Sequence, residues 1–247
     1  MSAKPYVFEE TVGIDTENAD IYATLTIPEE TWGAVIFAHG SGSSRHNPRH
    51  VFVAETFHRV GLATLLVDLL TPAEERVDQF TAQYRFDVEL LTNLLIAATD
   101  WLETSCSQYD FRIGYFGAST GAASAFKAAA RRREIAAIVS RGGRPDLAAD
   151  DLPKVEAATL LIVGSMDAPV IEQNRAAYKK LTRAYRREVS IVPGATHLFE
   201  EKGALDEVAQ LATQWFVRYL GAEVSRVNQN RGTNGKREVP ETQRRRW

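Results

Sequence analysis

Residues 111–130 read FRIGYFGASTGAASAFKAAA, and this stretch decides the fold. Its first half is an apolar run typical of a buried strand, and its second half is rich in strong helix formers. Between the two halves stands a G-x-S-x-G pattern, residues 117–121, centred on Ser119. A serine on a sharp strand-to-helix turn has a strained backbone, so the residues two positions away must lack bulk, and glycine meets that demand. We therefore predict that Ser119 is a nucleophile presented by such a turn.

The composition is that of an ordinary globular protein. The chain has 247 residues, of which 45% are hydrophobic and 25% charged, which fits one domain. A net charge of -3 gives no case for nucleic acid as the main partner and no general attraction to anionic membranes. No apolar run approaches the ~20 residues that a membrane span needs. We expect a small molecule as the partner, and the oligomeric state stays open.

Cysteine usage and the N-terminus predict the compartment. The single cysteine, Cys106, cannot form an intramolecular disulfide, which favours a reducing environment. The N-terminus runs into polar sequence without an apolar segment, so we predict no signal peptide and a cytoplasmic location. Cys106 falls near the end of a predicted helix, far from Ser119 in sequence, and we expect it to be a buried spectator.

The pattern of apolar residues predicts the sheet. Residues 6–12 and 21–27 alternate as half-buried antiparallel strands at a sheet edge do. After Pro28, short runs that are apolar throughout alternate with helical periodicity, which is typical of parallel strands covered on both faces. These predicted strands span residues 34–38, 62–67, 111–116, 135–139, 159–163 and 188–192. The sequence thus predicts an α/β fold with a mostly parallel, twisted sheet of about eight strands, helices on both faces and antiparallel N-terminal edge strands.

Helical periodicity is best seen in residues 86–102 and 204–217. The acidic segment 71–80 interrupts the pattern, and it is either a short cap over the site or a solvated loop. Residues 222–247 are polar and basic with almost no apolar side chains before Trp247, so we expect a disordered tail after a folded domain of residues 1–221.

A serine nucleophile needs a base and a group that orients the base. In strand-turn-helix sites of this kind the partners follow the serine in the order acid, then histidine, each on a loop after a strand. Asp167 comes just past the predicted strand 159–163, and His197 just past 188–192. The carboxyl ends of parallel strands share one sheet edge, so Ser119, Asp167 and His197 are predicted to meet there.

Other residues could fill the role of the acid. Asp68 also follows a predicted strand, but it precedes the serine. Asp146 follows the strand 135–139 and could serve in a variant with the acid one strand earlier, although we favour Asp167. The remaining histidines, His39, His46, His50 and His58, all precede the serine, so His197 alone satisfies the order.

The reaction also needs N–H donors aimed at the developing oxyanion. One donor is expected to be the amide of Thr120, which follows the nucleophile and starts a helix. The other is expected on the loop HGSGSSR, residues 39–45, where Gly40 and Gly42 let the backbone approach the substrate. We nominate the amide of Ser41, with Gly42 as the alternative. His39 is expected to brace this loop.

Two arginines, Arg141 and Arg144, follow the predicted strand 135–139, at the edge of the sheet where substrate is expected to bind. Arginine is the usual partner of carboxylate and phosphate groups, so they either bind an anionic group of the substrate or pair with an acid such as Asp146. His46 and His50 lie one helical turn apart, but no cysteine or acidic pair nearby supports a metal site. We expect neither a metal nor a cofactor.

With the serine, acid and histidine in place, the chain resembles the α/β-hydrolase superfamily over residues 5–221. Within it the chain is most similar to the dienelactone hydrolase family and its small relatives with a serine nucleophile. The matching stretches are residues 39–45, 114–123, 140–146 and 193–200. The resemblance implies the α/β-hydrolase fold, a Ser119–Asp167–His197 triad and a carboxylic ester or lactone as substrate. Dienelactone hydrolases proper carry cysteine at the elbow, so Ser119 is a departure that bears on the substrate.

Relatives of this kind are also found joined to phosphoribosyltransferase domains, and we expect no such domain within these residues. Our first hypothesis is a cofactor-free serine hydrolase acting on an ester, lactone or thioester. The alternatives are an acyltransferase on the same triad and a non-catalytic accessory protein on the hydrolase scaffold. A complete triad argues against the accessory protein.

Overall fold

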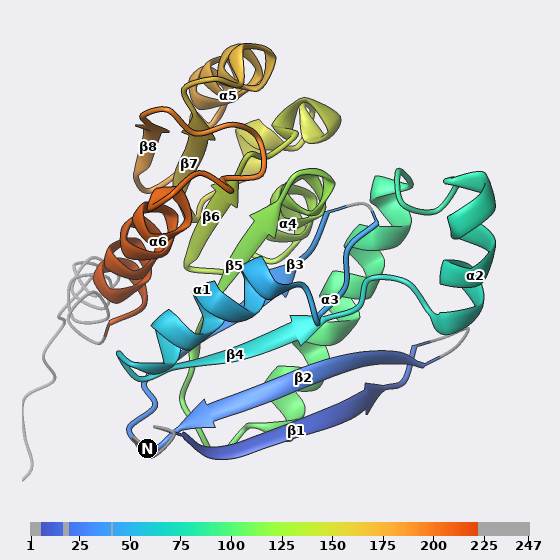
Figure 1. Ribbon diagram of the computed structural model, residues 1–247. Coiled ribbons are helices and arrows are strands. Elements are labelled where there is room, and N and C mark those ends of the chain that lie inside the picture. Colours follow the sequence, from blue (N-terminus) through green and yellow to red (C-terminus); the bar gives the residue numbers. More distant parts are fainter. Residues whose placement is uncertain (1–5, 17–19, 41, 222–247) are drawn as a thin grey trace, which may run out of the picture.

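Eight strands form one sheet in the order β1-β2-β4-β3-β5-β6-β7-β8 (Figure 1). The structure is a computed structural model that describes residues 6–16, 20–40 and 42–221, so the predicted tail, residues 222–247, lies outside the described part. The strands β3 to β8 run parallel, whereas β2 is antiparallel to both β1 and β4. The bounds are β1 (Tyr6–Ile14), β2 (Ile21–Pro28), β3 (Gly33–Ala38), β4 (Leu62–Val67), β5 (Arg112–Ala118), β6 (Ala137–Arg141), β7 (Ala158–Gly164) and β8 (Arg187–Val192). The mostly parallel sheet with antiparallel N-terminal edge strands is confirmed.

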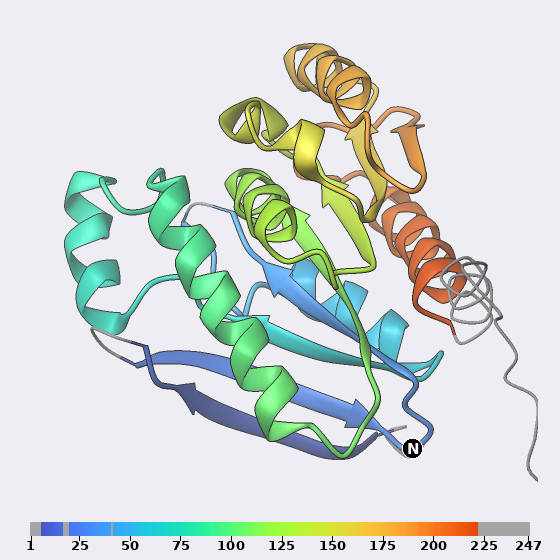
Figure 2. The same cartoon turned by 180° about the vertical axis from the view of Figure 1, so that it is seen from behind.

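Helices cover both faces of this sheet. On one face lie α1 (Pro48–His58) and α6 (Ala204–Leu220), and on the other lie α3 (Val88–Ser105), α4 (Thr120–Arg131) and α5 (Ala168–Lys180) (Figures 1 and 2). Because successive side chains of a strand point to opposite faces, each strand contributes to both cores. Phe37 and Phe116 pack on the side of α1 and α6, whereas Ile36 and Tyr115 pack on the side of α3 and α4.

The strand β6 differs from its prediction. It was expected over residues 135–139, but it begins at Ala137 and ends at Arg141. The N–H of Ile135 donates to the carbonyl of Arg132 over 3.3 Å, which closes the turn after α4 and keeps Ile135 out of the strand. Arg141 is therefore the last residue of a strand, where it is held by the sheet on both sides.

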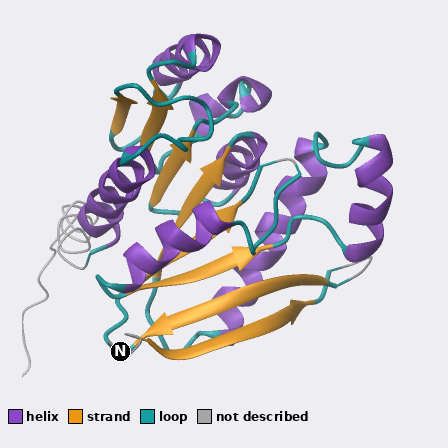
Figure 3. Ribbon diagram, viewed as in Figure 1, coloured by secondary structure: helices purple, strands orange, loops and turns teal. Residues whose placement is uncertain are grey.

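The acidic segment forms a helix, α2 (Pro72–Thr81), which stands apart from the helices that cover the sheet (Figure 3). Thr71 and Glu74 make a capping box: the Thr71 N–H donates to Oε2 of Glu74 over 2.8 Å, and the Glu74 N–H donates to Oγ1 of Thr71 over 3.2 Å. Among the described residues, none of the helices combines the length and the apolar character that crossing a lipid bilayer requires.

Candidate active site

Ser119 lies on the turn between β5 and α4, with φ 51° and ψ −121°. A residue with a side chain seldom adopts such a conformation, and holding it costs of order 1–3 kcal/mol. A Cβ atom at Gly117 would lie 2.5 Å from Cα of Ala122, and one at Gly121 would collide with the carbonyl oxygen of Ala38. The two glycines therefore permit the close passage of strand and helix that holds Ser119 at the carboxyl edge of the sheet.

His197 and Asp167 are in direct contact. Nδ1 of His197 lies 2.7 Å from Oδ2 of Asp167. Because a carboxylate accepts hydrogen bonds, we assign the proton to Nδ1, which leaves the lone pair on Nε2. The Asp167 side chain is 14% exposed and the His197 side chain 39%. The carboxylate is thus shielded from water, whereas the imidazole is accessible to a ligand.

The loops after β7 and β8, which carry these two side chains, are hydrogen-bonded to each other. The N–H of Met166 donates to the carbonyl of Ala195 over 2.9 Å. The N–H of Gly194 donates to Oγ of Ser165 over 2.7 Å. These bonds fix the relative position of Asp167 and His197.

The loop after β6 contacts both the serine and the histidine. The carbonyl of Arg141 accepts the N–H of Ser119 over 3.3 Å, and the N–H of Arg144 donates to the carbonyl of Ser119 over 3.0 Å. A Cβ atom at Gly142 would lie 3.4 Å from Cε1 of His197. One short loop therefore connects the nucleophile turn with the histidine loop at the same edge of the sheet.

The other candidate acids are engaged elsewhere. The carboxylate of Asp68 is paired with the guanidinium of Arg45. The carboxylate of Asp146 accepts two hydrogen bonds from the guanidinium of Arg144, at 2.9 and 2.8 Å. Of the three carboxylates considered from the sequence, Asp167 is the one bonded to the imidazole.

The loop after β3 passes directly beside Ser119. A Cβ atom at Gly40 would lie 3.0 Å from Cβ of Ser119, so only glycine allows so close an approach here. Gly42 has φ 68°, in the left-handed region. Ser41, nominated as an oxyanion donor, lies outside the described residues. Thr120, the other nominee, is the first residue of α4 and is buried.

His39 braces this loop, as predicted. Its Nδ1–H donates to the carbonyl of Gly40 over 2.9 Å, and its Nε2 accepts the N–H of Leu69 over 3.0 Å. Burial lowers the pKa of His39, which favours the neutral ring that can make both bonds. The imidazole therefore ties the loop after β3 to the chain that leaves β4.

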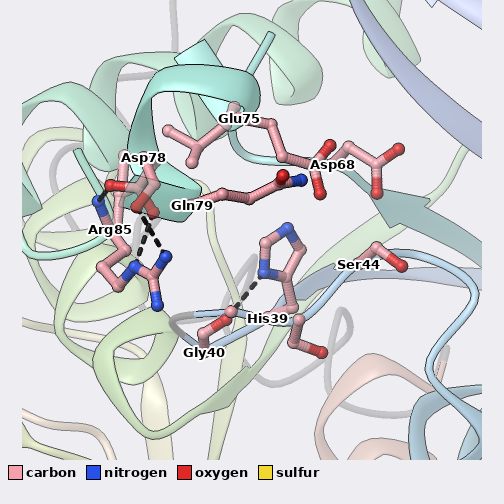
Figure 4. Close-up of a pocket in the computed structure, with 12 residues that line it drawn as sticks. His39, Gly40, Ser44, Asp68, Glu75, Asp78, Gln79 and Arg85 are labelled. Atoms are coloured by element: carbon pink, nitrogen blue, oxygen red, sulfur yellow. Dashed lines mark hydrogen bonds and ion pairs between the residues drawn. The ribbon is translucent and has the colours of Figure 1, made fainter. Parts of the chain in front are cut away.

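A cavity of about 310 Å³ opens between the loop after β3 and the helix α2. Figure 4 shows Gln79 of α2 reaching toward the ring of His39, whereas the side chain of Glu75 points toward Asp68. Its lining is half polar and comprises His39, Gly40, Gly42, Ser43, Ser44, Asp68, Leu70, Glu75, Asp78, Gln79, Arg85 and Leu91. Gly40 lines the cavity and also approaches Ser119, so the cavity lies next to the turn that carries Ser119. The segment 71–80 is thus a helix that covers this cavity and not a loop, and we call it the cap helix.

A buried ion pair fixes the cap. The carboxylate of Asp78 accepts the N–H groups of Tyr84 and Arg85 over 2.7 and 2.9 Å, and Nε of Arg85 over 2.5 Å. Burial by itself raises the pKa of Asp78, but these hydrogen bonds hold it below its usual value. Sequence reasoning missed both residues. Only the Thr71–Glu74 capping pattern could have predicted the helix, and no local pattern pairs Asp78 with Arg85.

The two arginines nominated for substrate differ in their surroundings. Arg144 forms the bidentate ion pair with Asp146 at the surface. Arg141 is 7% exposed, and no hydrogen bond to its Nε or Nη1 is found in the part of the chain that the structure describes.

No metal cluster accompanies the site in the described ranges, where no three His, Cys, Asp or Glu side chains come together. His50 is buried beside Phe37 and Phe116, whereas His46 is exposed. Cys106 is buried at the C-terminal end of α3, and burial raises the pKa of its thiol, which suits the spectator role expected for it.

The strand order, the strained serine on the turn and the histidine after the last strand define this protein as an α/β-hydrolase. A family model described as the dienelactone hydrolase family matches residues 21–221. The chain therefore belongs to the dienelactone hydrolase family, which is a family of hydrolases.

Comparisons with individual proteins agree with this family. The crystal structure of dienelactone hydrolase from Anabaena variabilis is 51% identical, covers 86% of this chain and 98% of its own, and superimposes with a TM-score of 0.83. Est1E from Butyrivibrio proteoclasticus shares the fold at 19% identity, covering 84% of this chain and 98% of its own, with a TM-score of 0.69.

Two curated relatives from Mycobacterium tuberculosis bear the name "Putative phosphoribosyl transferase" and are 49% identical over 220 residues. The match covers 89% of this chain and 48% of each relative, so the chain spans about half the length of these proteins.

Proposed function

We propose that the chain is a serine hydrolase that cleaves a carboxylic ester, lactone or thioester through an acyl-enzyme. The observation that carries this proposal is the 2.7 Å contact between Nδ1 of His197 and Oδ2 of Asp167, at the edge where the strained turn presents Ser119. A serine hydroxyl is a weak nucleophile and needs both a base and a group that orients the base. The three residues supply these roles.

Acylation begins when Oγ of Ser119 attacks the substrate carbonyl carbon and Nε2 of His197 takes the hydroxyl proton. Asp167 holds the imidazole in its tautomer and stabilises the imidazolium that forms. When the tetrahedral intermediate collapses, the bond from the carbonyl carbon to the leaving oxygen or sulfur breaks, and His197 returns the proton to the leaving group. With a lactone, the released hydroxyl stays attached to the acyl chain.

Deacylation repeats these steps with water. Nε2 of His197 takes one proton from a water molecule, and the resulting hydroxide adds to the acyl carbon. The ester bond to Ser119 then breaks, the proton returns to Oγ, and the carboxylic acid leaves.

Backbone amides supply the electrostatic stabilisation in this proposal. The N–H of Thr120 stands at the N-terminus of α4, where the helix dipole favours negative charge. The second donor is the amide of Ser41, with that of Gly42 as the alternative, and Gly40 provides the space that brings this loop to the substrate.

The cavity beside Gly40 supports a small substrate. Its volume of about 310 Å³ is at the lower end of the range of roughly 300–1,000 Å³ for small-molecule sites. Its polar lining suits a leaving group or an acyl chain that carries hydrogen-bonding atoms. The cytoplasmic location remains part of this proposal and rests on the single cysteine.

A fluorophosphonate probe tests the proposal, because it phosphonylates only an activated serine. We expect one probe molecule per native chain, located at Ser119 by peptide mass spectrometry, and no labelling of Ser119→Ala or of unfolded protein. Hydrolysis of p-nitrophenyl acetate is expected to be lost in the same variant. Absence of labelling in the native protein overturns the proposal. Added alcohol or amine acceptors separate hydrolysis from acyl transfer, since a transferase forms the new ester or amide in preference to the free acid.

A further inference from the structure

Arg141 carries a charge that the described residues do not neutralise. The side chain is 7% exposed, and its Nε and Nη1 atoms are fully buried without an acceptor in the described part of the chain. Arg144 has an acidic partner, Asp146, two positions later in the same loop, but none of the ion pairs among the described residues includes Arg141. A buried guanidinium without a partner is costly, because each lost hydration bond must be replaced.

The surroundings of Arg141 add positive rather than negative charge. Burial lowers the pKa of His50 well below its usual value, and the positive charges of Arg141 and of Arg49, at the start of α1, lower it further. The carboxylate of Glu200, which is largely exposed, is bonded to Nη1 of Arg49 over 2.9 Å. Nε of Arg49 is a further buried donor without an acceptor in the described residues.

The protein holds an aromatic ring against this guanidinium. The Cζ atom of Arg141 lies 5.8 Å from the ring centroid of Phe199, within the range of a cation–π contact. Phe199 has φ 57°, which is uncommon for a bulky residue, and its side chain is buried. An aromatic ring offsets only part of the desolvation of a cation, so the hydrogen-bonding capacity of Nε and Nη1 of Arg141 remains unused within the described residues.

Burial does not remove the charge. It lowers the pKa of Arg141 to about 10, which keeps the guanidinium protonated at neutral pH. The protein therefore contains a permanent, desolvated cation on the face of the sheet covered by α1 and α6.

This cation belongs to the catalytic edge. Arg141 pairs in register with Ala118, the residue before the nucleophile, and its carbonyl accepts the N–H of Ser119. Phe199 follows His197 by two positions. The backbone of Arg141 thus lies beside that of Ser119, and its guanidinium contacts Phe199 on the side of α1 and α6, whereas the cavity beneath α2 extends toward α3.

We propose that Arg141 binds an oxyanion group of the substrate, a carboxylate or a phosphate. As a statement about substrate, the proposal rests on the function proposed above. Binding of an anion at Arg141 does not depend on that function, so anion binding and catalysis can be tested separately.

Thermal unfolding of the full chain and of Arg141→Met tests the anion site without catalysis. We expect inorganic phosphate or succinate, against sodium chloride of equal ionic strength, to raise the Tm of the wild type by about 2–5 °C. We expect Arg141→Met, which replaces an unpaired buried cation by an apolar side chain, to have a Tm at or above that of the wild type and no response to either anion. The anion that acts more strongly identifies the group as carboxylate or phosphate.

The contrary results are equally clear. A wild type that does not respond to either anion overturns the proposal, and so does an Arg141→Met chain that is much less stable or fails to fold. Arg141→Lys keeps the charge but loses the planar fork, so we expect it to fold and to show a smaller anion response. If the wild type responds to the anions and Arg141→Lys does not respond at all, the result supports bidentate binding.

Kinetics connects the site to substrate. Two p-nitrophenyl esters are compared: one with a terminal carboxylate and its methyl-capped isostere. The preference for the carboxylate ester is the ratio of the two kcat/KM values. We expect this ratio to fall about 10- to 100-fold in Arg141→Met, mainly through a higher KM for the carboxylate ester. Arg144→Met is the matched control, because its guanidinium is already paired with Asp146, and its ratio is expected to stay that of the wild type. An unchanged ratio in Arg141→Met overturns the substrate role. If Ser119 is not a nucleophile, every variant lacks activity while the anion-dependent Tm shift persists.

Discussion

Nδ1 of His197 and Oδ2 of Asp167 lie 2.7 Å apart although the residues are separated by 30 positions in sequence. Their contact depends on two neighbouring parallel strands, β7 and β8, which end at the same edge of the sheet. The carboxylate of Asp167 is shielded and the imidazole of His197 is open to solvent, which suits the roles that we propose for them.

Asp167→Asn should therefore impair catalysis while leaving the fold intact. An amide can donate to Nδ1, which favours the tautomer with its proton on Nε2 and removes the base. We expect kcat for p-nitrophenyl acetate to fall by about 10³- to 10⁴-fold, measured with protein whose Tm is checked in parallel. Asp146→Asn, whose carboxylate is bonded to Arg144, is the control and should keep kcat within about twofold. Equal losses in the two variants would contradict the role of Asp167.

Gly40→Ala should reduce activity through geometry alone. The added Cβ would stand 3.0 Å from Cβ of Ser119 and 3.1 Å from the carbonyl oxygen of Ala118, so the loop after β3 must move away. A displacement of about 1 Å near the reacting atoms can cost about 100-fold in rate. We expect a loss of about 10- to 100-fold in kcat. Gly13→Ala meets nothing within 4 Å and should leave kcat unchanged.

The cap should loosen in acid. The pKa of Asp78 lies below its ordinary value of 3.8 because hydrogen bonds from Arg85 and Tyr84 outweigh the effect of burial. The folded state thus binds this proton less readily than the unfolded chain. The contribution of Asp78 to stability is complete above the ordinary carboxyl pKa and is lost as pH falls through the lowered value.

Hydrogen-exchange protection factors of α2 measure this effect. We expect protection to fall between pH 5 and about pH 2 in the wild type, and to be low already at pH 7 in Asp78→Asn. Glu172→Gln, which removes an exposed ion pair with Arg175 on α5, should behave as the wild type does. If α2 is protected at pH 7 in Asp78→Asn as strongly as in the wild type, Asp78 does not hold the cap helix in place.

Cys106 should be inert in the native protein. Its thiol is buried, and burial raises its pKa, so little thiolate is present or accessible at neutral pH. We expect the native chain to react with a thiol reagent only on unfolding, whereas Cys106→Ala/Ser107→Cys, with a cysteine at the exposed neighbouring position, reacts at once. Cys106→Ala should cost about 1 kcal/mol in stability and leave kcat unchanged. Rapid labelling of the native wild type would show that the helix end opens.

The sequence predicted correctly those features that depend on residues close together in the chain. The elbow around Ser119 is confirmed as a strained turn, because strand, glycines and helix lie within one short stretch. The sheet was predicted from runs of apolar residues, and its parallel order follows from the alternation with helices. The strand β6 begins two residues later than predicted because an apolar residue such as Ile135 suits a strand and a buried turn equally well. The hydrogen bond from Ile135 to Arg132 places Ile135 in the turn.

The sequence alone determined the elbow, the chain order of the candidate catalytic residues and the class of fold, since these depend on local steric and periodic constraints. Only the tertiary structure decided which acid reaches His197, that residues 71–80 form a cap held by Asp78 and Arg85, and that Arg141 is buried while Arg144 is paired. The physical reason is that the partners in such pairs are chosen by packing between elements far apart in the chain. Desolvation and hydrogen-bond geometry then set the energy of each pair.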